Sequence, residues 1–462
     1  MAAHLIIETL RELRRYALDR GAVAAIHWNA EDSHMVRYAN SAISLNSHED
    51  LVRMRVSVYD GRREATTGLI VDPADIDAMK RAIDQAIDMV PFASEKTYEP
   101  TIATIPETVV YEGSYDPEVV ELTNEEIIAF VNDAVAGLET EDILLSGNFS
   151  AGVVEQAVIW TTSDNVVCRR STDIGITLVL ASEKRKWEIN AEQFVWRKAD
   201  LDAQALHDRL RWLSTCYNTC PEERAEERPY RVIMGPAAIA EYLMYLEWLG
   251  TAGGSMKRGF SMLKDDSVGQ KIMSDRFTLV EDPSLLDTFP MPVDLYGRRR
   301  DARAVYDRGV FTGFIWDQAS ADEFGASPTA SDVPNLSFKL MGGDAEWTSI
   351  QALAEEPRDE DLLYIPYLHY GGIVNPSEGL ITGSSRFGAL LLKKDGSIAL
   401  PYNVRFTEKL SDLFGKKLVW LAKETMPYGS SSHYGGRDPY SMIVPVLGCF
   451  DDINVEISNK SF

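Results

Sequence analysis

The sequence has few cysteines, and their positions argue against a disulfide framework. Only four occur in 462 residues, at Cys168, Cys216, Cys220 and Cys449. Small secreted domains that depend on disulfides carry many more cysteines, at close and regular spacing. We therefore expect these four side chains to be free thiols.

Long apolar runs are also absent. No stretch of about eighteen apolar residues occurs, so the sequence predicts no membrane-spanning helix. The first residues, MAAHLIIETLRELRRYALDRGA, mix charges with apolar positions at helical spacing, which differs from the apolar core of a signal peptide. The sequence therefore predicts a cytoplasmic protein.

Basic residues are in deficit. The chain has 46 Lys and Arg against 71 Asp and Glu, which gives a formal net charge of -25. A field of this sign repels phosphate backbones and anionic lipids, so it disfavours binding to nucleic acid or membranes. It is compatible with a solvated acidic surface, and also with attraction of basic peptides or a basic partner subunit.

The first half of the chain combines helical and alternating patterns. Hydrophobic residues make up 45% of the chain, enough for a sizeable core. An amphipathic helix is predicted over 5–20, with Leu5, Ile6, Leu10, Leu13 and Ala17 on one face. Strands follow Gly21, with a hairpin at Asp60-Gly61 and an extended connector over 91–114. Further helices are predicted at 73–89, 124–138 and 202–217, and further strands at 143–150, 155–161 and 175–181.

The second half has short strand patterns and many glycines. The charged, proline-bounded stretch PEERAEERPY suggests a boundary between domains at 1–220 and 221–462. The predicted fold class is α+β, with an N-terminal sheet-and-helix domain and a C-terminal strand-rich, barrel-like domain. One good helix is predicted at 237–249, and strands are predicted at 277–280, 388–392, 397–399 and 442–447.

Three long phrases in the second half carry a family resemblance. They read YRVIMGPAAIAEYL, then TAGGSMKRGFSMLKDDSVGQKIMSDRFTLVEDP, then GRRRDARAVYDRGVFTGFIWDQASADEFGASPTASDVPNLSF. Looser matches are RMRVSVYDGRREATTG and GLITGSSRFGALLLKKDGSIALPY. Together these segments resemble the TldD/PmbA family, whose members are also called modulators of DNA gyrase.

The resemblance implies a family with two branches. The catalytic branch is similar to a zinc peptidase, with a helical H-E-x-x-x-H motif and a later cysteine as third ligand. The other branch, PmbA/TldE, lacks the motif and pairs with a catalytic subunit in a heterodimer that trims unstructured peptides. Family members also mature ribosomally made peptides.

In this chain the motif reads Leu246-Glu247-Trp248-Leu249-Gly250-Thr251. Glutamate and glycine are retained, whereas Leu246 and Thr251 replace the two histidines. Leucine has no lone pair, a threonine hydroxyl is a poor zinc ligand, and no histidine lies between His207 and His369. The sequence thus predicts a degenerate motif without bound metal, and zinc only in a catalytic partner.

Substrate contacts are predicted on both sides of the expected cleft. The resemblance implies peptide binding near Gly253, Gly254 and Ser255, where a glycine pair permits main-chain pairing with an extended peptide. In the C-terminal segment, Tyr434 stands where the catalytic branch has its cysteine. Candidate substrate-binding residues there are His433, Tyr434 and Gly435, while Cys449 is predicted to be a buried thiol.

Three hypotheses for function remain open from the sequence. The favoured one is a non-catalytic partner of a TldD-type zinc peptidase, which holds an extended peptide. The second is a stand-alone peptide-binding scaffold of a biosynthetic pathway, with a metal-independent homodimer as a variant. The third is an enzyme with relocated, metal-free chemistry that uses Glu247, His433 or Cys449.

Overall fold

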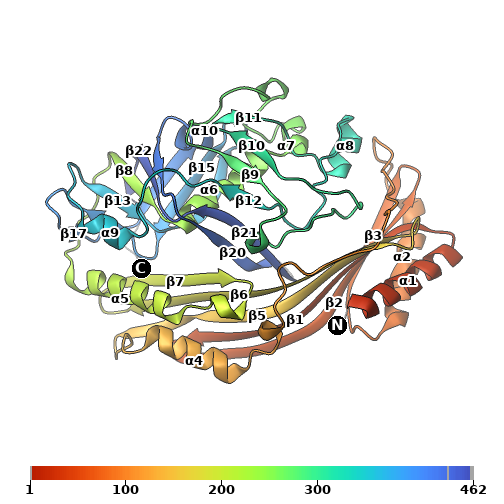
Figure 1. Cartoon of the computed structure of the whole chain (residues 1–462), viewed down its shortest axis with the longest axis horizontal. Coiled ribbons are helices and arrows are strands. Elements are labelled where there is room, and N and C mark those ends of the chain that lie inside the picture. Colours follow the sequence, from red (N-terminus) through yellow and green to blue (C-terminus); the bar gives the residue numbers. More distant parts are fainter. Residues whose placement is uncertain (1–2, 434–435, 458–462) are drawn as a thin grey trace.

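The computed structural model describes residues 3–433 and 436–457, and it has the predicted α+β architecture. A long, curved N-terminal sheet forms the base of the molecule, and the C-terminal half lies on one face of it (Figure 1). Helices cover parts of the opposite face at its two ends (Figure 1). Among the described residues, no helix is both long and apolar enough to cross a membrane.

The N-terminal sheet is built from unusually long antiparallel strands. Its order is β3-β2-β1-β5-β6-β4, and β7 pairs with β6. The hairpin predicted at Asp60-Gly61 is confirmed, because β2 ends at Asp60 and Gly61 has a φ of 55°. The strands are β1 (Val23–Ala39), β2 (Ala42–Asp60), β3 (Arg63–Val71), β4 (Val109–Tyr111), β5 (Ile143–Trp160), β6 (Val166–Ser182) and β7 (Trp187–Val195).

Two strand predictions in this sheet were too short. The segments 143–150 and 155–161 form one strand, β5, which continues through Gly152. A side chain at Gly152 would meet the backbone of Ser33 at 2.8 Å, so the glycine permits close approach of β1. The first half of β6 was missed because Arg169, Ser171 and Asp173 are buried against the C-terminal half. These polar side chains obscure the apolar-polar alternation of a strand.

The N-terminal helices cover the face of the sheet that is turned away from the C-terminal half. The apolar stripe of α1 is buried as predicted at Ile6, Leu10, Leu13 and Ala17, whereas Leu5 is 44% exposed. The helix predicted from Pro73 begins later, at Ile76, because the Asp75 side chain accepts a hydrogen bond from the Ala78 N–H. The helices are α1 (Ala3–Asp19), α2 (Ile76–Met89), α3 (Pro117–Val120), α4 (Asn124–Val135) and α5 (Ala203–Thr219).

The C-terminal half contains three open sheets rather than the predicted barrel-like closure. Their orders are β11-β10-β9-β12-β21-β20, β17-β16-β13-β8-β22-β19 and β14-β15-β18-β23. None of these paths closes on itself among the described residues, because α6 packs between strands of different sheets and fills the centre. The strand-rich character predicted for this half is confirmed.

The short elements of this half surround one long helix, α6, which was predicted over 237–249. The helices are α6 (Pro236–Gly250), α7 (Gly253–Lys257), α8 (Gln318–Phe324), α9 (Ile350–Glu355) and α10 (Leu410–Leu413). The strands are β8 (Pro229–Met234), β9 (Leu279–Glu281), β10 (Arg303–Asp307), β11 (Val310–Phe311), β12 (Phe338–Leu340), β13 (Leu362–Ile365), β14 (Tyr367–Asn375), β15 (Leu380–Arg386), β16 (Leu390–Leu392), β17 (Ile398–Ala399), β18 (Val404–Lys409), β19 (Leu418–Leu421), β20 (Thr425–His433), β21 (Gly436–Pro445), β22 (Gly448–Asn454) and β23 (Glu456–Ile457).

Apolar packing joins the two halves of the chain. Leu206, Leu210 and Leu213 of α5 belong to the same buried cluster as Leu390 and Leu392 of β16. This shared core positions the C-terminal half over the inner face of the sheet. The boundary predicted at residue 220 lies between α5 and β8, and the division into domains 1–220 and 221–462 stays a prediction.

Candidate functional site

The antiparallel hairpin β20–β21 projects from the C-terminal half onto the inner face of the N-terminal sheet (Figure 1). Arg437, near its tip, binds Asp173 of β6 through two hydrogen bonds of 2.7 and 2.8 Å. Its Nη1 atom also donates to Ser150 Oγ at 2.8 Å. Both charged side chains are almost completely buried. Burial raises the pKa of Asp173, and the Arg437 charge opposes that shift.

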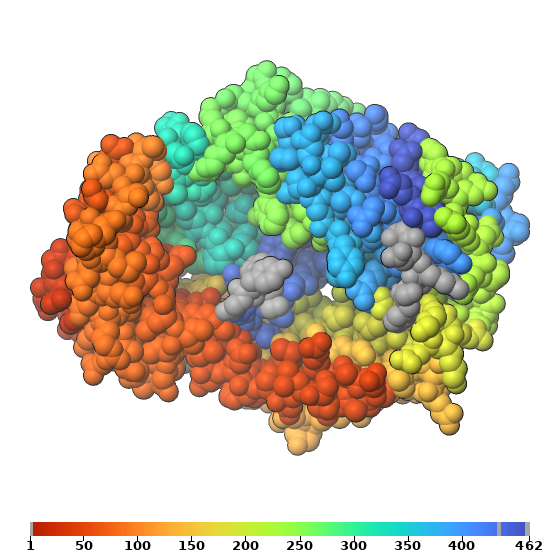
Figure 2. Space-filling model, turned by 180° about the vertical axis from the view of Figure 1, so that it is seen from behind, coloured from red at the N-terminus to blue at the C-terminus, as the bar shows by residue number. Residues whose placement is uncertain are grey.

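Two cavities lie on either side of this hairpin. The larger cavity, about 970 Å³, lies between strands β1, β2, β3 and β5 of the N-terminal sheet and residues 295–296 and 332–334 of the C-terminal half. It contributes to the hollow beside the red-orange arm in Figure 2. The smaller, about 550 Å³, lies between β6, β7, α5 and the start of β20. Both have walls from the two halves of the chain, so an extended ligand could contact both halves at once.

Aromatic side chains form one wall of the larger cavity. The rings of Tyr59 and Trp160 stack with their centroids 5.8 Å apart, and Trp160 lies 5.1 Å from the ring of Tyr296. Asp332 lies nearby, and burial raises the pKa of its carboxyl to about 7. The exposed Arg55 also lines this cavity. The wall thus offers flat apolar contacts together with charges of both signs.

The predicted degenerate motif lies on the C-terminal part of α6. Pro236 at the first turn and an almost continuous apolar sequence favour a buried helix here. Leu246 is fully buried in the C-terminal core, and Glu247 is partly exposed, turned about 100° from it around the helix axis. Thr251 ends the helix, and its hydroxyl donates to the Glu247 carbonyl at 2.6 Å.

These residues do not fit the zinc ion that the family resemblance implies for the catalytic branch. Leu246 offers no ligand atom, and its side chain packs into the core. The Thr251 hydroxyl is already engaged by the helix backbone. Gly250 is also committed to packing, since its carbonyl accepts a 2.6 Å hydrogen bond from the Tyr306 hydroxyl. The side chains at the two former histidine positions of α6 are therefore unable to hold a zinc ion.

Glu247 nonetheless has an unusual environment. Burial raises the pKa of its carboxyl to about 7, although a hydrogen bond from the Tyr440 hydroxyl, at 3.3 Å, opposes the shift. Near neutral pH this carboxyl therefore populates both protonation states. It can therefore either accept or donate a hydrogen bond, whereas a glutamate with an ordinary pKa is ionised at this pH and only accepts.

Two further carboxyls share this character, and the sequence did not reveal them. Burial raises the pKa of Glu241 on α6, and a hydrogen bond with Tyr245 opposes the shift. Burial likewise raises the pKa of Glu192 on β7, which is opposed by Arg209 and by a hydrogen bond with Tyr428. Glu192 lies on a different element from the two α6 carboxyls, and no sequence pattern indicates that Glu241 is buried.

The predicted peptide-binding glycines lie in α7, directly after α6. A side chain at Gly253 would meet the Trp316 ring at 2.3 Å, and one at Gly254 would meet Ser320 Oγ at 2.2 Å. The Gly253 N–H already donates to the Ile315 carbonyl at 2.8 Å. These glycines permit close packing against the segment around α8, while Ser255 is partly exposed. Their role in binding peptide stays a prediction.

Of the second group of predicted contacts, only His433 belongs to the described residues. His433 ends β20, whereas Tyr434 and Gly435 lie outside the described residues. The tip approaches β2, since a side chain at Gly436 would meet Arg53 Nε at 3.3 Å. Glu247 instead contacts Tyr440, four residues along β21, or about 13 Å from the tip. The structure therefore does not bring the tip and the α6 motif into one contact.

Cys449 is a buried thiol, as predicted. Its side chain is 1% exposed in β22, and burial raises the pKa of the thiol to about 12. A thiol with this pKa is protonated near neutral pH, so it is a poor nucleophile. This result disfavours the hypothesis of relocated cysteine chemistry.

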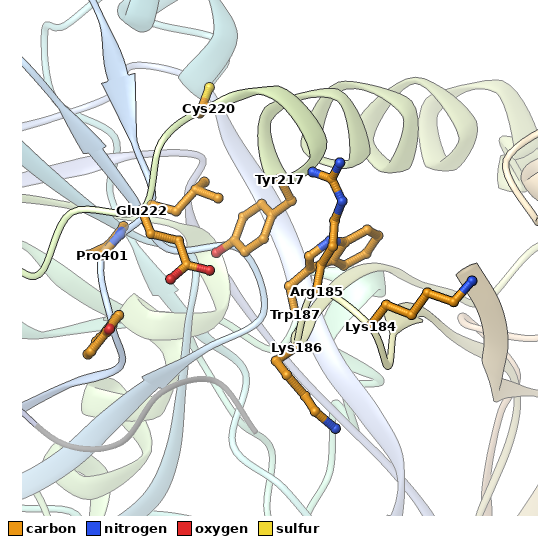
Figure 3. Close-up of a pocket in the computed structure, with 10 residues that line it drawn as sticks. Lys184, Arg185, Lys186, Trp187, Tyr217, Cys220, Glu222 and Pro401 are labelled. Atoms are coloured by element: carbon orange, nitrogen blue, oxygen red, sulfur yellow. The ribbon is translucent and has the colours of Figure 1, made fainter. Parts of the chain in front are cut away.

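A smaller cavity of about 270 Å³ lies at the turn between β6 and β7. Figure 3 shows that Tyr217 and Glu222 point toward one another across it. The Lys184 side chain extends away from them, so the basic residues of this turn do not converge on one point (Figure 3). It has no lining residue in common with the two hairpin cavities.

Known proteins share both the fold and part of the sequence. Residues 227–455 match the family model described as the PmbA/TldA metallopeptidase C-terminal domain. A protein named metalloprotease, from Archaeoglobus fulgidus, is 26% identical over 147 residues, which are 31% of this chain. The match spans only a third, 33%, of that relative's length.

Three solved structures have the same fold over nearly the whole chain. TldE from Thermococcus kodakarensis has a TM-score of 0.73 at 16% identity, covering 97% of this chain and 99% of its own. A candidate modulator of DNA gyrase from Bacteroides thetaiotaomicron has a TM-score of 0.77 at 16% identity, covering 98% of both chains. Another, from Thermotoga maritima, has a TM-score of 0.72 at 14% identity, covering 97% and 99%. The matched C-terminal sequence and the shared fold together mean that this chain belongs to the TldD/PmbA family.

Proposed function

We propose that this chain is a non-catalytic subunit of a TldD-type zinc metallopeptidase complex in the cytoplasm. In this role it pairs with a catalytic homologue and holds an unstructured peptide beside the β20–β21 hairpin. The complex trims such peptides or matures ribosomally made ones. The zinc belongs to the partner subunit.

The observation that carries this proposal is the state of the α6 motif. Glu247 is retained and partly exposed, but Leu246 is packed into the core and the Thr251 hydroxyl is bonded to the helix backbone. The likeness to TldE supports the same role, although at 16% identity it concerns the fold alone. The acidic surface, with a net charge of -25, suits a basic partner or basic peptides.

The first experiment compares three samples: this chain, a TldD-type homologue from the same genome, and the two mixed. Cleavage of an unstructured peptide is followed by mass spectrometry, and assembly by size-exclusion chromatography with light scattering. We expect a heterodimer and chelator-sensitive cleavage only in the mixture. Chelator-sensitive cleavage by this chain alone would refute the proposal, as would a stable homodimer that ignores the homologue.

A second experiment tests whether the larger cavity holds the peptide. Tyr59→Ala removes an aromatic wall of that cavity, whereas Tyr98→Ala removes a tyrosine that does not line it. We expect Tyr59→Ala to weaken peptide binding at least about fivefold, the loss expected for an aromatic contact residue. Fluorescence anisotropy with a labelled peptide measures both variants. If this chain alone bound the peptide tightly and did not cleave it, the result would instead favour the scaffold hypothesis.

A further inference from the structure

A cluster of metal-binding side chains lies on β1 and β2, away from the hairpin cavities. Asp32 and His34 are two residues apart on β1, so they point to the same face of the sheet. His48 of β2 is paired directly with His34. The ligand atoms of the three side chains all lie within 4.8 Å of one another.

The geometry within this cluster is close to that of a metal site. His48 Nε2 lies 2.8 Å from Asp32 Oδ1, and the imidazole rings of His34 and His48 stack with centroids 4.3 Å apart. Ligands of a tetrahedral zinc ion with bonds near 2.05 Å are separated by about 3.3 Å. To hold one ion, the 2.8 Å contact between Asp32 and His48 must open slightly and the two stacked rings must rotate out of their parallel arrangement.

The donor set selects a particular class of ion. Two imidazoles and one carboxylate suit zinc and its neighbours in the transition series, whereas magnesium and calcium prefer oxygen ligands.

The cluster lies on the helix-bearing face of the sheet, opposite the C-terminal half. Trp28 and Val36, on the same face of β1, pack into the helix-side clusters. Glu31, on the other face, accepts a hydrogen bond from the Arg437 N–H of the hairpin. The side chains of Asp32 and His48 are 41% and 52% exposed, so an ion in solution can reach them.

Within the described part of the chain, the cluster also lies where no strand pairs with the outer edge of β2. β3 pairs with β2 only from Val52 to Asp60, so His48 belongs to an unpaired edge segment. Both faces of this segment are largely exposed, including Ile43 and Leu45. An ion held by one ligand from β2 and two from β1 would tie this edge to the body of the sheet.

We propose that Asp32, His34 and His48 form a binding site for one divalent transition-metal ion, separate from the α6 motif. The three protein ligands leave at least one coordination position for water or for an external ligand. The site does not depend on whether the chain works as a non-catalytic subunit. Without an ion, His48 lies within hydrogen-bonding distance of Asp32, and its ring stacks on that of His34.

The test is a titration of the purified, chelator-treated chain with Co²⁺ and Zn²⁺. Isothermal calorimetry gives stoichiometry and affinity, and the visible absorption of Co²⁺ reports nitrogen ligation. We expect one equivalent to bind, and His34→Ala and His48→Ala each to weaken binding at least about tenfold. This is the loss that removal of an outer-shell partner alone can cause. Asp32→Asn should weaken binding while preserving the shape of the side chain.

His4→Ala is the matched control, because it removes an exposed histidine outside the cluster. It should bind the ion like the unmodified chain, and circular dichroism should show that all variants are folded. Loss of tight binding only in the three cluster variants supports the site. Equal affinity in all variants, or no binding below millimolar Co²⁺ and Zn²⁺, would overturn the proposal.

Discussion

The tip and the middle of the β20–β21 hairpin contact buried carboxyls with different partners. At the tip, Arg437 and Asp173 neutralise one another, and Gln156 donates to Asp438 at 3.0 Å. In the middle, Glu247 meets the hydroxyl of Tyr440 instead of a cation. Among the residues that the structure describes, no ion pair joins Glu241 or Glu247 to a basic side chain.

This difference separates a docking contact from a candidate binding surface. A buried, fully paired charge fixes the position of the hairpin on the sheet, because any other position would leave the charge unpaired. A carboxyl that faces only hydroxyl groups keeps a raised pKa and retains the capacity to interact with a ligand. The tip therefore fixes the hairpin on the sheet, and the middle carries Glu247, a partly exposed carboxyl whose pKa is raised to about 7.

The largest expected effect comes from removing the ion pair between Arg437 and Asp173 at the hairpin tip. Arg437→Ala leaves Asp173 buried without its cationic partner, and we expect the free energy of unfolding to fall by about 3–5 kcal/mol. Urea denaturation followed by fluorescence measures the loss. The double variant Arg437→Met, Asp173→Leu should recover much of it, since it removes both charges. A loss below about 1 kcal/mol in the single variant would show that the pair does not fix the hairpin.

The next effect concerns the middle of the hairpin and depends on pH. The pKa of Glu247 is raised from 4.5 to about 7, so in that range the native state keeps a proton that the unfolded state loses. Wild-type stability should therefore fall as pH rises from about 4.5 to 7, whereas Glu247→Gln should lack this component. The pH-dependent change in the free energy of unfolding should differ between the two proteins by at most about 3 kcal/mol. Solvent screening of the partly exposed carboxyl reduces this difference. Parallel stability curves from pH 4 to 8 would contradict the raised pKa.

A smaller effect distinguishes packing from binding at α7. Gly253→Ala places a methyl group against the Trp316 ring, so we expect a loss of about 1–3 kcal/mol in stability. Ser255→Ala, at a partly exposed position, should change stability by no more than about 0.5 kcal/mol. Thermal denaturation measures both. If Gly253→Ala weakened peptide binding without loss of stability, the glycine would contact peptide, as the sequence predicts.

The smallest effect isolates one hydrogen bond. Tyr440→Phe removes the hydroxyl that favours the ionised form of Glu247, so the pKa of Glu247 should rise further, by up to about one unit. NMR titration of the glutamate side-chain carboxyl carbons, assigned with Glu247→Gln, measures this change. An unchanged or lower pKa would mean that Tyr440 does not stabilise the carboxylate.

Much of the fold could be predicted because local patterns report it directly. The stripe of α1 follows the 3.6-residue period, and the helix predicted at 237–249 extends by only one residue at each end. The sequence predicted only residues 175–181 of β6 and did not predict β7. Their inward side chains include Asp173 and Glu192, which are polar because they face the hairpin instead of apolar core.

The candidate site was predicted only where a motif was continuous in the chain. Glu247 was identified from its neighbours, but nothing in the sequence indicated that Tyr440 would contact it or that its pKa would be raised. The same holds for the metal cluster on β1 and β2. His34 and His48 are fourteen positions apart, and only the strand register places them opposite one another.

The sequence by itself determined the family, the α+β class and the replacement of both histidines in the α6 motif, because each is written in contiguous residues. The tertiary structure decided which buried charges are paired, where the cavities lie and which side chains can share an ion. These properties depend on contacts between distant segments. Burial and partner geometry set the pKa of a carboxyl, and neither is encoded in the spacing along the chain.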